Sequence, residues 1–479
     1  MIVPWVFSLQ GSSELHERTE KKRAIVIGGG VTGLSAAHEL SKHGWQVDLF
    51  EARCYFGGAA ASSSIAGLDI DRFYHFFCRG DEHLFSLLQE LELGDELHWH
   101  RCRMAALLFE GLFEFGSGVG DLFGLHVLSA KDRLQLALAL AKLHFSSPQA
   151  WHELRGRSAW DWVEQVSAGA ARKIYHPLLR AKFGRRAEEI AAPWLWARMK
   201  RVAQSQGASL GGQCLAFLEH GSKSLVEKLV KSLKRRDCRL HRSSPVKAVL
   251  LDETESKVRG AIIDSSTERE DLIEAQLLLA CIPAKIHSKL LRSSTASSLK
   301  NRGLQEYLRQ LDSLEYYSLS CYRAVSHKRA SPYFWINLCT NEGLACGVVE
   351  IDLPEGMREN AASVLYLPCY HRQDQIPSDE DCLKGAQQSL AGISKNFASS
   401  ELLAEEILRE EQAQPLCKLG FEENWQGSQS TPITGLFFSD ASRVFPWDRS
   451  LSASIDQGRK LARQGNALFG AASAERNEN

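Results

Sequence analysis

The 12 cysteines of this 479-residue chain form no CxxC pair. They stand singly along the sequence, which argues against a cysteine zinc site and against a dithiol redox couple. We therefore expect no bound metal. Because unpaired thiols suit a reducing compartment better than a secreted protein, we expect a cytoplasmic location.

Long hydrophobic runs are lacking as well. No segment approaches the roughly 18 uninterrupted apolar residues that a membrane-spanning helix needs, so no transmembrane segment is predicted. Residues 1–9 are apolar but lack the basic flank and the cleavage site of a signal peptide. We expect residues 1–22 to be a poorly ordered tail and residues 473–479 to be a second tail.

The chain has no excess of charge of either sign. Its 57 basic and 58 acidic side chains give a formal net charge of -1, whereas nucleic-acid binders usually carry a clear basic excess. We therefore expect no nucleic-acid partner. The local basic run 231–236 is interpreted as the solvated C-terminal end of an amphipathic helix, where cations interact favourably with the helix dipole.

A short apolar strand followed by a glycine-rich turn stands near the N-terminus. Residues 24–27 are typical of a strand buried on both faces of a parallel sheet. The following turn matches GxGxxG and opens a predicted helix over residues 31–43. In such a turn the first glycine allows the tight bend, the second lets the backbone approach a pyrophosphate, and the third lets the helix pack on the strand. The expected contacts with a dinucleotide are Gly28, Gly29, Gly30, Val31, Thr32 and Gly33.

An acidic residue follows at the expected distance. The predicted second strand, residues 46–50, ends at Glu51, which stands 51 − 33 = 18 positions after Gly33, close to the roughly 20 of the dinucleotide fingerprint. Its carboxylate would accept hydrogen bonds from ribose hydroxyls and repel a 2′-phosphate, so NADP is disfavoured. Arg53 weakens that exclusion. These residues alone leave both FAD and NAD open.

The sequence after Glu51 resembles the extended motif of the flavin amine oxidase superfamily. This superfamily includes monoamine oxidases, protoporphyrinogen oxidase, carotenoid desaturases and UDP-galactopyranose mutase. Gly57 and Gly58 match its Gly-Gly pair, although Ala59 replaces the arginine that many members have next. Segments 244–249, 435–440 and 450–459 resemble its later flavin motifs, with Ser439 in place of a glycine. The resemblance implies FAD as the cofactor and adds contacts from Arg53, Gly57, Gly58, Val246, Asp440 and Ser452.

The order of these motifs implies the organisation of the fold. We expect an α/β protein in which a discontinuous Rossmann-type FAD-binding domain carries an inserted α+β substrate domain with a mixed sheet and helices. The expected FAD-binding segments are 23–80, 205–290 and 415–472, and the expected substrate-domain segments are 81–204 and 291–414. The glycine-rich stretch 116–120 has the wrong spacing for a second dinucleotide site and is interpreted as a loop.

Sequence periodicity predicts the elements of the substrate domain. Residues 130–144 and 158–183 are predicted helices. We interpret the leucine-rich helix 130–144 as a buried core helix because few anchoring residues flank it, while peripheral contact with a membrane stays open. Aromatic and β-branched residues predict four strands of a mixed sheet, at 316–325, 333–338, 347–351 and 364–370.

Candidate catalytic residues fall into two groups. The resemblance implies that segment 71–77 runs beneath the flavin, where His75 either hydrogen-bonds to the ring and polarises it or only packs beside it. Segments 177–184 and 194–198 resemble a protoporphyrinogen oxidase-like bacterial subgroup. Segment 446–449 resembles the same subgroup. Lys182, Arg198 and Arg449 of these segments either hold an anionic substrate or form salt bridges. Glu350 is either paired with one of these cations or an acid of the site.

Three functions fit the sequence. The favoured one is an FAD-dependent oxidoreductase, acting as an oxidase, dehydrogenase or desaturase, which takes a hydride from a C–N or C–C bond of a small-molecule substrate of anionic or lipidic character. The alternative is a redox-neutral mutase or isomerase that uses reduced flavin on an activated sugar. A non-catalytic binder is disfavoured by the intact glycine and acidic motifs. The oligomeric state stays open.

Overall fold

Five parallel strands carry the glycine-rich turn. The computed structural model describes residues 22–116, 120–205, 213–264, 270–294, 301–340, 344–353, 361–394, 397, 399–423 and 429–477. The strand order is β19-β13-β1-β2-β9, and every neighbouring pair is parallel. The strands are β1 (Arg23–Ile27), β2 (Gln46–Phe50), β9 (Arg239–His241), β13 (Leu277–Ala280) and β19 (Leu436–Phe438). One sheet thus collects three distant parts of the chain.

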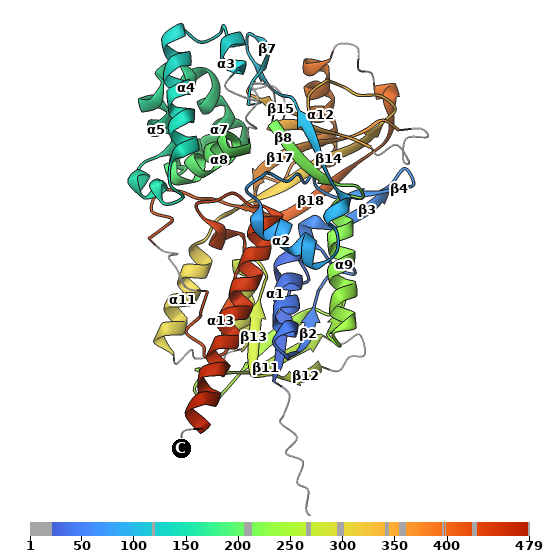
Figure 1. Ribbon diagram of the computed structural model, residues 1–479, viewed down its shortest axis with the longest axis vertical. Coiled ribbons are helices and arrows are strands. Elements are labelled where there is room, and N and C mark those ends of the chain that lie inside the picture. Colours follow the sequence, from blue (N-terminus) through green and yellow to red (C-terminus); the bar gives the residue numbers. More distant parts are fainter. Residues whose placement is uncertain are drawn as a thin grey trace, which may run out of the picture.

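Three helices cover one face of this sheet. Helices α1 (Val31–Lys42), α13 (Leu451–Asn477) and α9 (Ser222–Arg235) lie side by side (Figure 1). A Cβ atom on Gly458 of α13 would stand 2.2 Å from the Thr32 carbonyl oxygen, so only glycine permits α13 to cross α1 this closely. Helix α13 continues to Asn477, into the predicted C-terminal tail. Of the predicted tail 1–22, residues 1–21 lie outside the described residues.

Smaller elements complete the lower half of Figure 1. An antiparallel sheet has the order β10-β11-β12, and two helices pack beside it and against each other. The elements are β10 (Val246–Leu251), β11 (Val258–Asp264), β12 (Glu270–Glu274), α10 (Ala284–Ser294) and α11 (Arg302–Ser313). The basic run 231–236 stands at the end of α9 as predicted, with exposed side chains at Arg235 and Arg236.

The second large sheet is mixed, which confirms the predicted fold class. Its order is β18-β14-β17-β16-β15-β6-β7, and only β15 and β6 pair in parallel among these strands. Its strands are β6 (Met104–Leu108), β7 (Gly111–Glu114), β14 (Tyr316–Ser326), β15 (Trp335–Leu338), β16 (Gly347–Asp352), β17 (Ser363–Arg372) and β18 (Leu402–Pro415). The four predicted strands are present, whereas β6, β7 and β18 were not anticipated. Helix α12 (Asp379–Ile393) covers one face.

The predicted single helix 158–183 is wrong. It is broken at Ser167, which has extended backbone angles (φ −161°, ψ 111°) and whose hydroxyl caps the next segment through Ala170 N–H. The segments are α5 (Ala159–Val166), α6 (Ala168–Ala170), a π-helical turn (Ala171–Tyr175) and α7 (His176–Phe183). Helix α8 (Ala192–Ser205) follows and packs against α4 and α5.

Helix α4 (Ala130–Phe145) is not the buried core helix that we favoured. Leu136 and Leu143 are buried, but Leu134 and Leu138 are each 62% exposed and Phe145 is 85% exposed. These three residues recur at helical spacing, so α4 presents an apolar stripe to the outside. No helix in the described part of the chain is long and apolar enough to span a membrane.

Two two-stranded antiparallel sheets stand apart from the larger sheets. Strands β3 (Ser62–Ile65) and β4 (Leu68–Asp71) form one, and β5 (Leu97–Cys102) pairs with β8 (Gln213–Leu218) to form the other. The latter joins a segment that we assigned to the substrate domain with one assigned to the FAD-binding domain. The helices α2 (Glu82–Glu90) and α3 (Asp121–Gly124) lie nearby in sequence. Of the stretch 116–120, Gly116 and Gly120 lie in a bend and a turn, and residues 117–119 lie outside the described residues.

One fully buried arginine fastens the β3–β4 hairpin to the mixed sheet. Arg323 of β14 donates to the carbonyl oxygens of Ile70 (3.1 Å) and Asp71 (2.8 Å), to Ser63 Oγ (3.0 Å) and to the Glu406 carboxylate (2.8 Å). Its guanidinium is therefore surrounded by acceptors on two elements. A buried cation whose partners are so complete is costly to disrupt.

We expect Arg323→Met to lower the free energy of unfolding by about 3–5 kcal/mol, because it leaves Glu406 and two carbonyl groups without a buried donor. Urea unfolding followed by circular dichroism measures this loss. The control is Lys328→Met, which removes the half-exposed ion pair with Glu401 and should cost less than about 1 kcal/mol. Equal losses in the two variants would contradict the role of Arg323.

Candidate functional site

The C-terminal ends of the five parallel strands meet at one edge of their sheet. Gly28 follows β1, Cys281 follows β13 and Glu51 follows β2. Backbone hydrogen bonds join them: Gly28 N–H to Phe50 O (2.8 Å), Cys281 N–H to Ile27 O (2.8 Å) and Glu51 N–H to His241 O (2.8 Å). Ligands of open α/β sheets bind at this edge.

Two glycines of the turn are required by the protein itself. Gly28 has φ +99°, and a Cβ atom there would stand 2.4 Å from the Cys281 carbonyl oxygen. A Cβ atom on Gly33 would stand 1.9 Å from the Gly28 carbonyl oxygen. These contacts are the tight bend and the close helix packing that the motif predicts.

Neither the backbone conformation nor the packing of the protein requires a glycine at position 30. Its backbone is extended (φ −70°, ψ 174°), and a Cβ atom there would meet no atom within 4 Å. Gly30 is also the N-cap of α1, and no side chain caps that helix. The first amides of α1, at Val31, Thr32 and Gly33, therefore border open space at the positive end of a helix dipole. This is the donor set and the room that a diphosphate needs, so the residues fit FAD.

The other predicted dinucleotide contacts gather around this turn. Gly57 N–H donates to Gly29 O (2.8 Å), and a Cβ atom on Gly58 would stand 3.2 Å from Gly30 Cα. The Glu51 carboxylate accepts from Gly29 N–H (2.6 Å) and Arg53 N–H (2.8 Å). A carboxylate has about four lone-pair sites, which leaves acceptor capacity for ribose hydroxyls.

Residues near the ends of other strands complete this group. Ser244 N–H donates to Glu51 O (2.9 Å), which brings the start of β10 and Val246 toward Glu51. The Arg53 guanidinium is held by the Glu410 carboxylate of β18 (2.9 and 3.0 Å), so its charge is already paired.

Asp440 and Ser452 are also engaged by the protein. The Asp440 carboxylate accepts from Ala284 N–H (3.1 Å), Ser442 N–H (2.9 Å) and the Tyr316 hydroxyl. The Ser452 hydroxyl accepts from Leu84 N–H (3.3 Å). These contacts leave the role of Asp440 and Ser452 toward a ligand as a prediction.

Segment 71–77 leads from the glycine turn to a second group of polar residues. The Asp71 carboxylate accepts from Ser222 N–H (3.0 Å) at the start of α9, and His75 Nδ1 lies 3.5 Å from Asp71 Oδ2. Tyr74, next to His75, packs edge-on against Trp335 (5.2 Å between ring centres) and Tyr366 (6.1 Å). His75 and Tyr74 thus have different neighbours.

Three cations and two aromatic rings interleave beyond Tyr74. We call Tyr74, Lys182, Trp194, Arg198, Tyr370, Asp448 and Arg449 the cation–aromatic cluster. Lys182 Nζ lies 4.9 Å from the ring centres of both Trp194 and Tyr370. The Arg449 guanidinium donates to the Tyr370 hydroxyl (2.9 Å), and Arg198 pairs with the Asp448 carboxylate (2.5 Å). Trp194 and Arg198 share a face of α8 because they are four residues apart.

The cluster shifts the ionisation of two of its members. Burial, reinforced by the neighbouring Arg198 charge, lowers the pKa of Lys182 to about 7, although Asp448 opposes this. Burial acts to raise the pKa of Asp448, but Arg198, Lys182 and Arg449 outweigh it and hold that pKa well below its usual range. At neutral pH Asp448 is therefore ionised, whereas Lys182 is divided between its charged and neutral forms.

Glu350 belongs to neither predicted role. It is buried, and its carboxylate accepts from Ala330 N–H (2.8 Å), Ser331 N–H (3.0 Å) and Ser363 Oγ (2.8 Å). It forms no ion pair with Lys182, Arg198 or Arg449, and its nearest cation is Arg329 at 3.8 Å. Glu350 therefore anchors a loop rather than serving the site.

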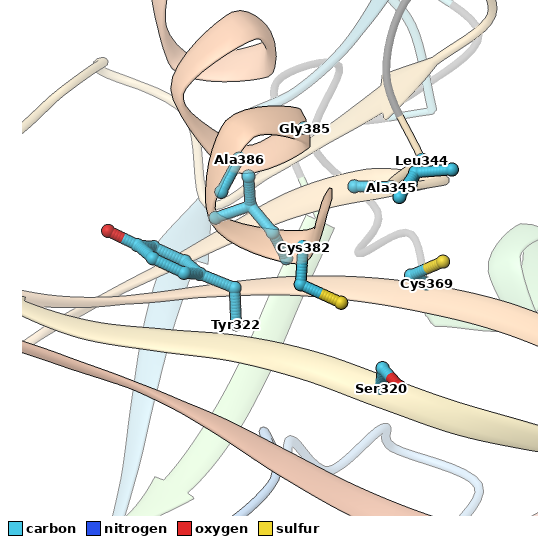
Figure 2. Close-up of a pocket in the computed structure, with 9 residues that line it drawn as sticks. Ser320, Tyr322, Leu344, Ala345, Cys369, Cys382, Gly385 and Ala386 are labelled. Atoms are coloured by element: carbon cyan, nitrogen blue, oxygen red, sulfur yellow. The ribbon is translucent and has the colours of Figure 1, made fainter. Parts of the chain in front are cut away.

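A small cavity lies on the opposite face of the mixed sheet. Figure 2 shows its lining between α12 and strands β14 and β17, with Cys382, Tyr322 and Cys369 among the residues. It has room for about one water molecule. Because side chains alternate along a strand, Cys369 faces this cavity while its neighbour Tyr370 faces the cation–aromatic cluster.

Sequence reasoning found part of the cluster. Lys182 and Arg198 were predicted and lie close enough for Arg198 to lower the pKa of Lys182, but His75 contacts neither of them among the described residues. Tyr74, Trp194 and Asp448 were not proposed as site residues, although all three belong to segments that resemble the protein family. The available signal was their position beside predicted residues, since Tyr74 precedes His75, Trp194 stands four residues before Arg198 and Asp448 precedes Arg449.

Comparison with known proteins gives a family match. The sequence model described as "Flavin containing amine oxidoreductase" matches residues 31–324, more than half of the chain. The predicted resemblance is thereby confirmed.

Individual relatives are distant. The zeta-carotene desaturase of Synechocystis is 24% identical over 283 residues, which cover 54% of this chain and 57% of the relative. A reduced UDP-galactopyranose mutase has a TM-score of 0.71 at 14% identity, covering 94% of this chain and 96% of the other. A provisionally named protoporphyrinogen oxidase from Exiguobacterium has a TM-score of 0.67 at 18% identity, covering 92% and 98%. At such identities, the structural likeness shows a shared fold.

The two kinds of glycine make a test of the dinucleotide turn. We expect Gly30→Ala to leave the unfolding temperature of the apoprotein unchanged but to weaken FAD binding by about 1–3 kcal/mol, because the new methyl group occupies the place of the diphosphate. Flavin fluorescence titration measures the affinity.

Gly33→Ala is the matched comparison. Its methyl group meets the Gly28 carbonyl, so we expect it to lower the unfolding temperature of the apoprotein itself. Undiminished FAD affinity in Gly30→Ala would show that the diphosphate lies elsewhere.

Proposed function

Because the chain belongs to the family of flavin-containing amine oxidoreductases, with FAD as its cofactor, we propose that it is an oxidoreductase that takes a hydride from a C–N or C–C bond of a small-molecule substrate. FAD, when bound, supplies the hydride acceptor. The protein's own residues bind the cofactor, orient the substrate and control charge at the site. The chain spans 57% of the length of its Synechocystis relative. The proposed activity is therefore argued from the residues of this chain described above and not from the activity of that relative.

The observation that carries this proposal is the position of segment 71–77. It begins at Asp71, whose carboxylate lies at the start of α9, and it sends Tyr74 toward the cation–aromatic cluster. A cofactor held at Gly30 and Glu51 and a substrate held at the cluster would therefore meet along this segment. Oxidation by hydride transfer requires such a meeting.

The chain's residues take distinct roles in this proposal. The α1 amides and Gly30 hold the diphosphate, and Glu51 accepts from the ribose. Lys182 orients the substrate, and the charge of Arg198 is paired with Asp448. His75, whose buried Nδ1 has no hydrogen-bond partner among the described residues, is a hydrogen-bond partner for the flavin ring.

The cluster favours a polar substrate. A carotene, the substrate in the name of the Synechocystis relative, offers no polar group to Lys182, Arg198 or Arg449. A redox-neutral reaction on an activated sugar is not favoured, because the family and the Synechocystis relative are oxidoreductases. The 12 free cysteines support a cytoplasmic location.

We expect anaerobic addition of a true substrate to bleach the flavin absorbance of the purified holoprotein. A panel of amines, sugar nucleotides and isoprenoids, each with and without a carboxylate, tests this. Hydrogen peroxide release when oxygen is admitted would identify an oxidase. Gly30→Ala without bound flavin is the blank.

Two outcomes would overturn the proposal. One is turnover of a sugar nucleotide only after dithionite reduction, with no net oxidation, which would identify a mutase. The other is a colourless protein that ignores added FAD, which would identify a non-catalytic binder.

A further inference from the structure

We propose that the cation–aromatic cluster binds an anionic oxygen group of the substrate, a carboxylate or a phosphate, through Lys182, Arg449 and Tyr74. This inference deepens the proposed function and rests on it, since it places the substrate's acidic end at the same site. It follows from the charges and the unsatisfied donors of the cluster.

The cluster carries more positive than negative charge. Lys182, Arg198 and Arg449 face a single carboxylate, Asp448, which forms its ion pair with Arg198. No other carboxylate of the described residues lies within 4.0 Å of the nitrogens of these three cations. The neighbouring Arg201 is neutralised separately by Asp81 (3.0 Å). Lys182 and Arg449 thus lack a counter-ion of their own.

Several donors of the cluster also lack acceptors, although the Arg449 guanidinium donates to the Tyr370 hydroxyl (2.9 Å) and to Ala413 O. Lys182 is only 9% exposed, and within the described part of the chain its ammonium contacts aromatic rings but no hydrogen-bond acceptor. Arg449 Nε is buried without a partner. Tyr74 is half-buried, and its hydroxyl has no hydrogen-bond partner among the described residues. Buried donors are normally satisfied, and an oxyanion offers several lone pairs at once.

The aromatic rings do not make this a site for an amine. Trp194 already has Lys182 at 4.9 Å and Arg198 at 5.8 Å from its ring centre. Tyr370 has Lys182 at 4.9 Å and Arg449 at 5.8 Å. The protein's own cations therefore already lie over these rings, and a substrate ammonium would approach three basic side chains and only one carboxylate.

Binding of an anion must favour the charged form of Lys182. Because burial lowers the pKa of free Lys182 to about 7, and a bound anion would raise it, binding takes up a proton above pH 7. Affinity is then greatest below pH 7 and falls as the pH rises, by up to about tenfold per pH unit.

The other groups that face Lys182 do not change charge in this range. Burial acts to lower the pKa of Arg449, but Tyr370 and Asp448 outweigh it and raise that pKa, so Arg449 stays protonated. Asp448 stays ionised because its pKa is held well below its usual range. Burial raises the pKa values of Tyr74, Tyr370 and Cys346, so these groups stay neutral. The pH dependence of anion binding therefore reports on Lys182.

Matched aromatic probes test the inference on the FAD-loaded protein. Isothermal titration calorimetry with benzoate, phenyl phosphate, benzyl alcohol and benzylamine compares a carboxylate, a phosphate, a neutral group and a cation on one ring. We expect benzoate or phenyl phosphate to bind, whichever anion the site prefers, and benzylamine not to bind. Titration in two buffers of different ionisation enthalpy should show proton uptake at pH 8. Tighter binding of benzylamine than of either anion would overturn the inference.

Variants of the cluster make the test specific. Lys182→Met and Arg449→Met should each weaken anion binding by about ten- to a hundredfold. Arg180→Met is the matched control, because it removes an exposed cation from the same helix, α7, that pairs with Glu188. Lys182→Arg should retain anion binding and lose the pH dependence above pH 7. Equal losses in Arg180→Met and Lys182→Met would overturn the inference.

Failure of this inference can be told apart from failure of the proposed function. The titrations need no turnover, and FAD content together with the unfolding temperature shows that each variant is folded. Anion binding without flavin bleaching by any substrate would refute the oxidoreductase function alone. Bleaching by substrates without an acidic group, with no anion binding, would refute the anion site alone.

Discussion

The arrangement of the two sheets depends on the buried guanidinium of Arg323. Its planar set of donors meets acceptors on the β3–β4 hairpin and on β18 at the same time, which a lysine could not do with one nitrogen. Tyr366 supports the same point by donating to Asp71 O (2.7 Å). Through these contacts the mixed sheet fixes Asp71, and Asp71 in turn holds the start of α9 and lies beside His75. The hydrogen bonds of Arg323 therefore fix the position of the elements that bind the cofactor relative to those of the mixed sheet.

Side chains that alternate along β14 and β17 place the residues of the candidate site on one face of the mixed sheet and packing residues on the other. Arg323, Tyr366 and Tyr370 face the segment that runs from the glycine turn to the cluster. Their neighbours in sequence, such as Tyr322, Leu367 and Cys369, face α12, where small and apolar side chains leave only a small cavity. A shift of either strand by one residue would exchange the two faces.

At the glycine turn and at the cluster, some residues serve the protein's own packing and charge balance, whereas others are left available for a ligand. Gly28 and Gly33 serve the protein's own packing, whereas the space over Gly30 is left for a ligand. In the cluster, Asp448 neutralises Arg198, whereas Lys182 is buried against rings without a counter-ion. Burying a cation in this way is unfavourable for folding alone, and burial accordingly lowers the pKa of Lys182 to about 7. A bound diphosphate would fill the space over Gly30, and a bound anion would supply the counter-ion that Lys182 lacks.

The sequence by itself determined the elements whose signals are local. Strand β1, the turn at Gly28–Gly33, helix α1 and strand β2 were predicted almost to the residue, because apolar runs and glycine spacing report directly on backbone geometry. The four aromatic and β-branched strands of the mixed sheet were predicted for the same reason. Strand β18 was missed because its glutamate-rich sequence has no alternating apolar pattern. The break at Ser167 was missed because a capping serine looks like any other polar residue within a helix.

Only the tertiary structure decided which distant residues meet. Helix α4 was expected in the core. Its exposed leucines could not be predicted, because periodicity identifies an apolar face of a helix but does not show whether another element packs against that face. Glu350 was expected near the cations but lies among loop amides. The cation–aromatic cluster joins α7, α8, β17 and the segment before α13, which stand up to 375 residues from Tyr74 in sequence. The balance of charges among these residues and their exclusion from solvent arise only when the chain is folded. The sequence can therefore indicate the cofactor-binding motif, but only the tertiary structure shows the candidate substrate site.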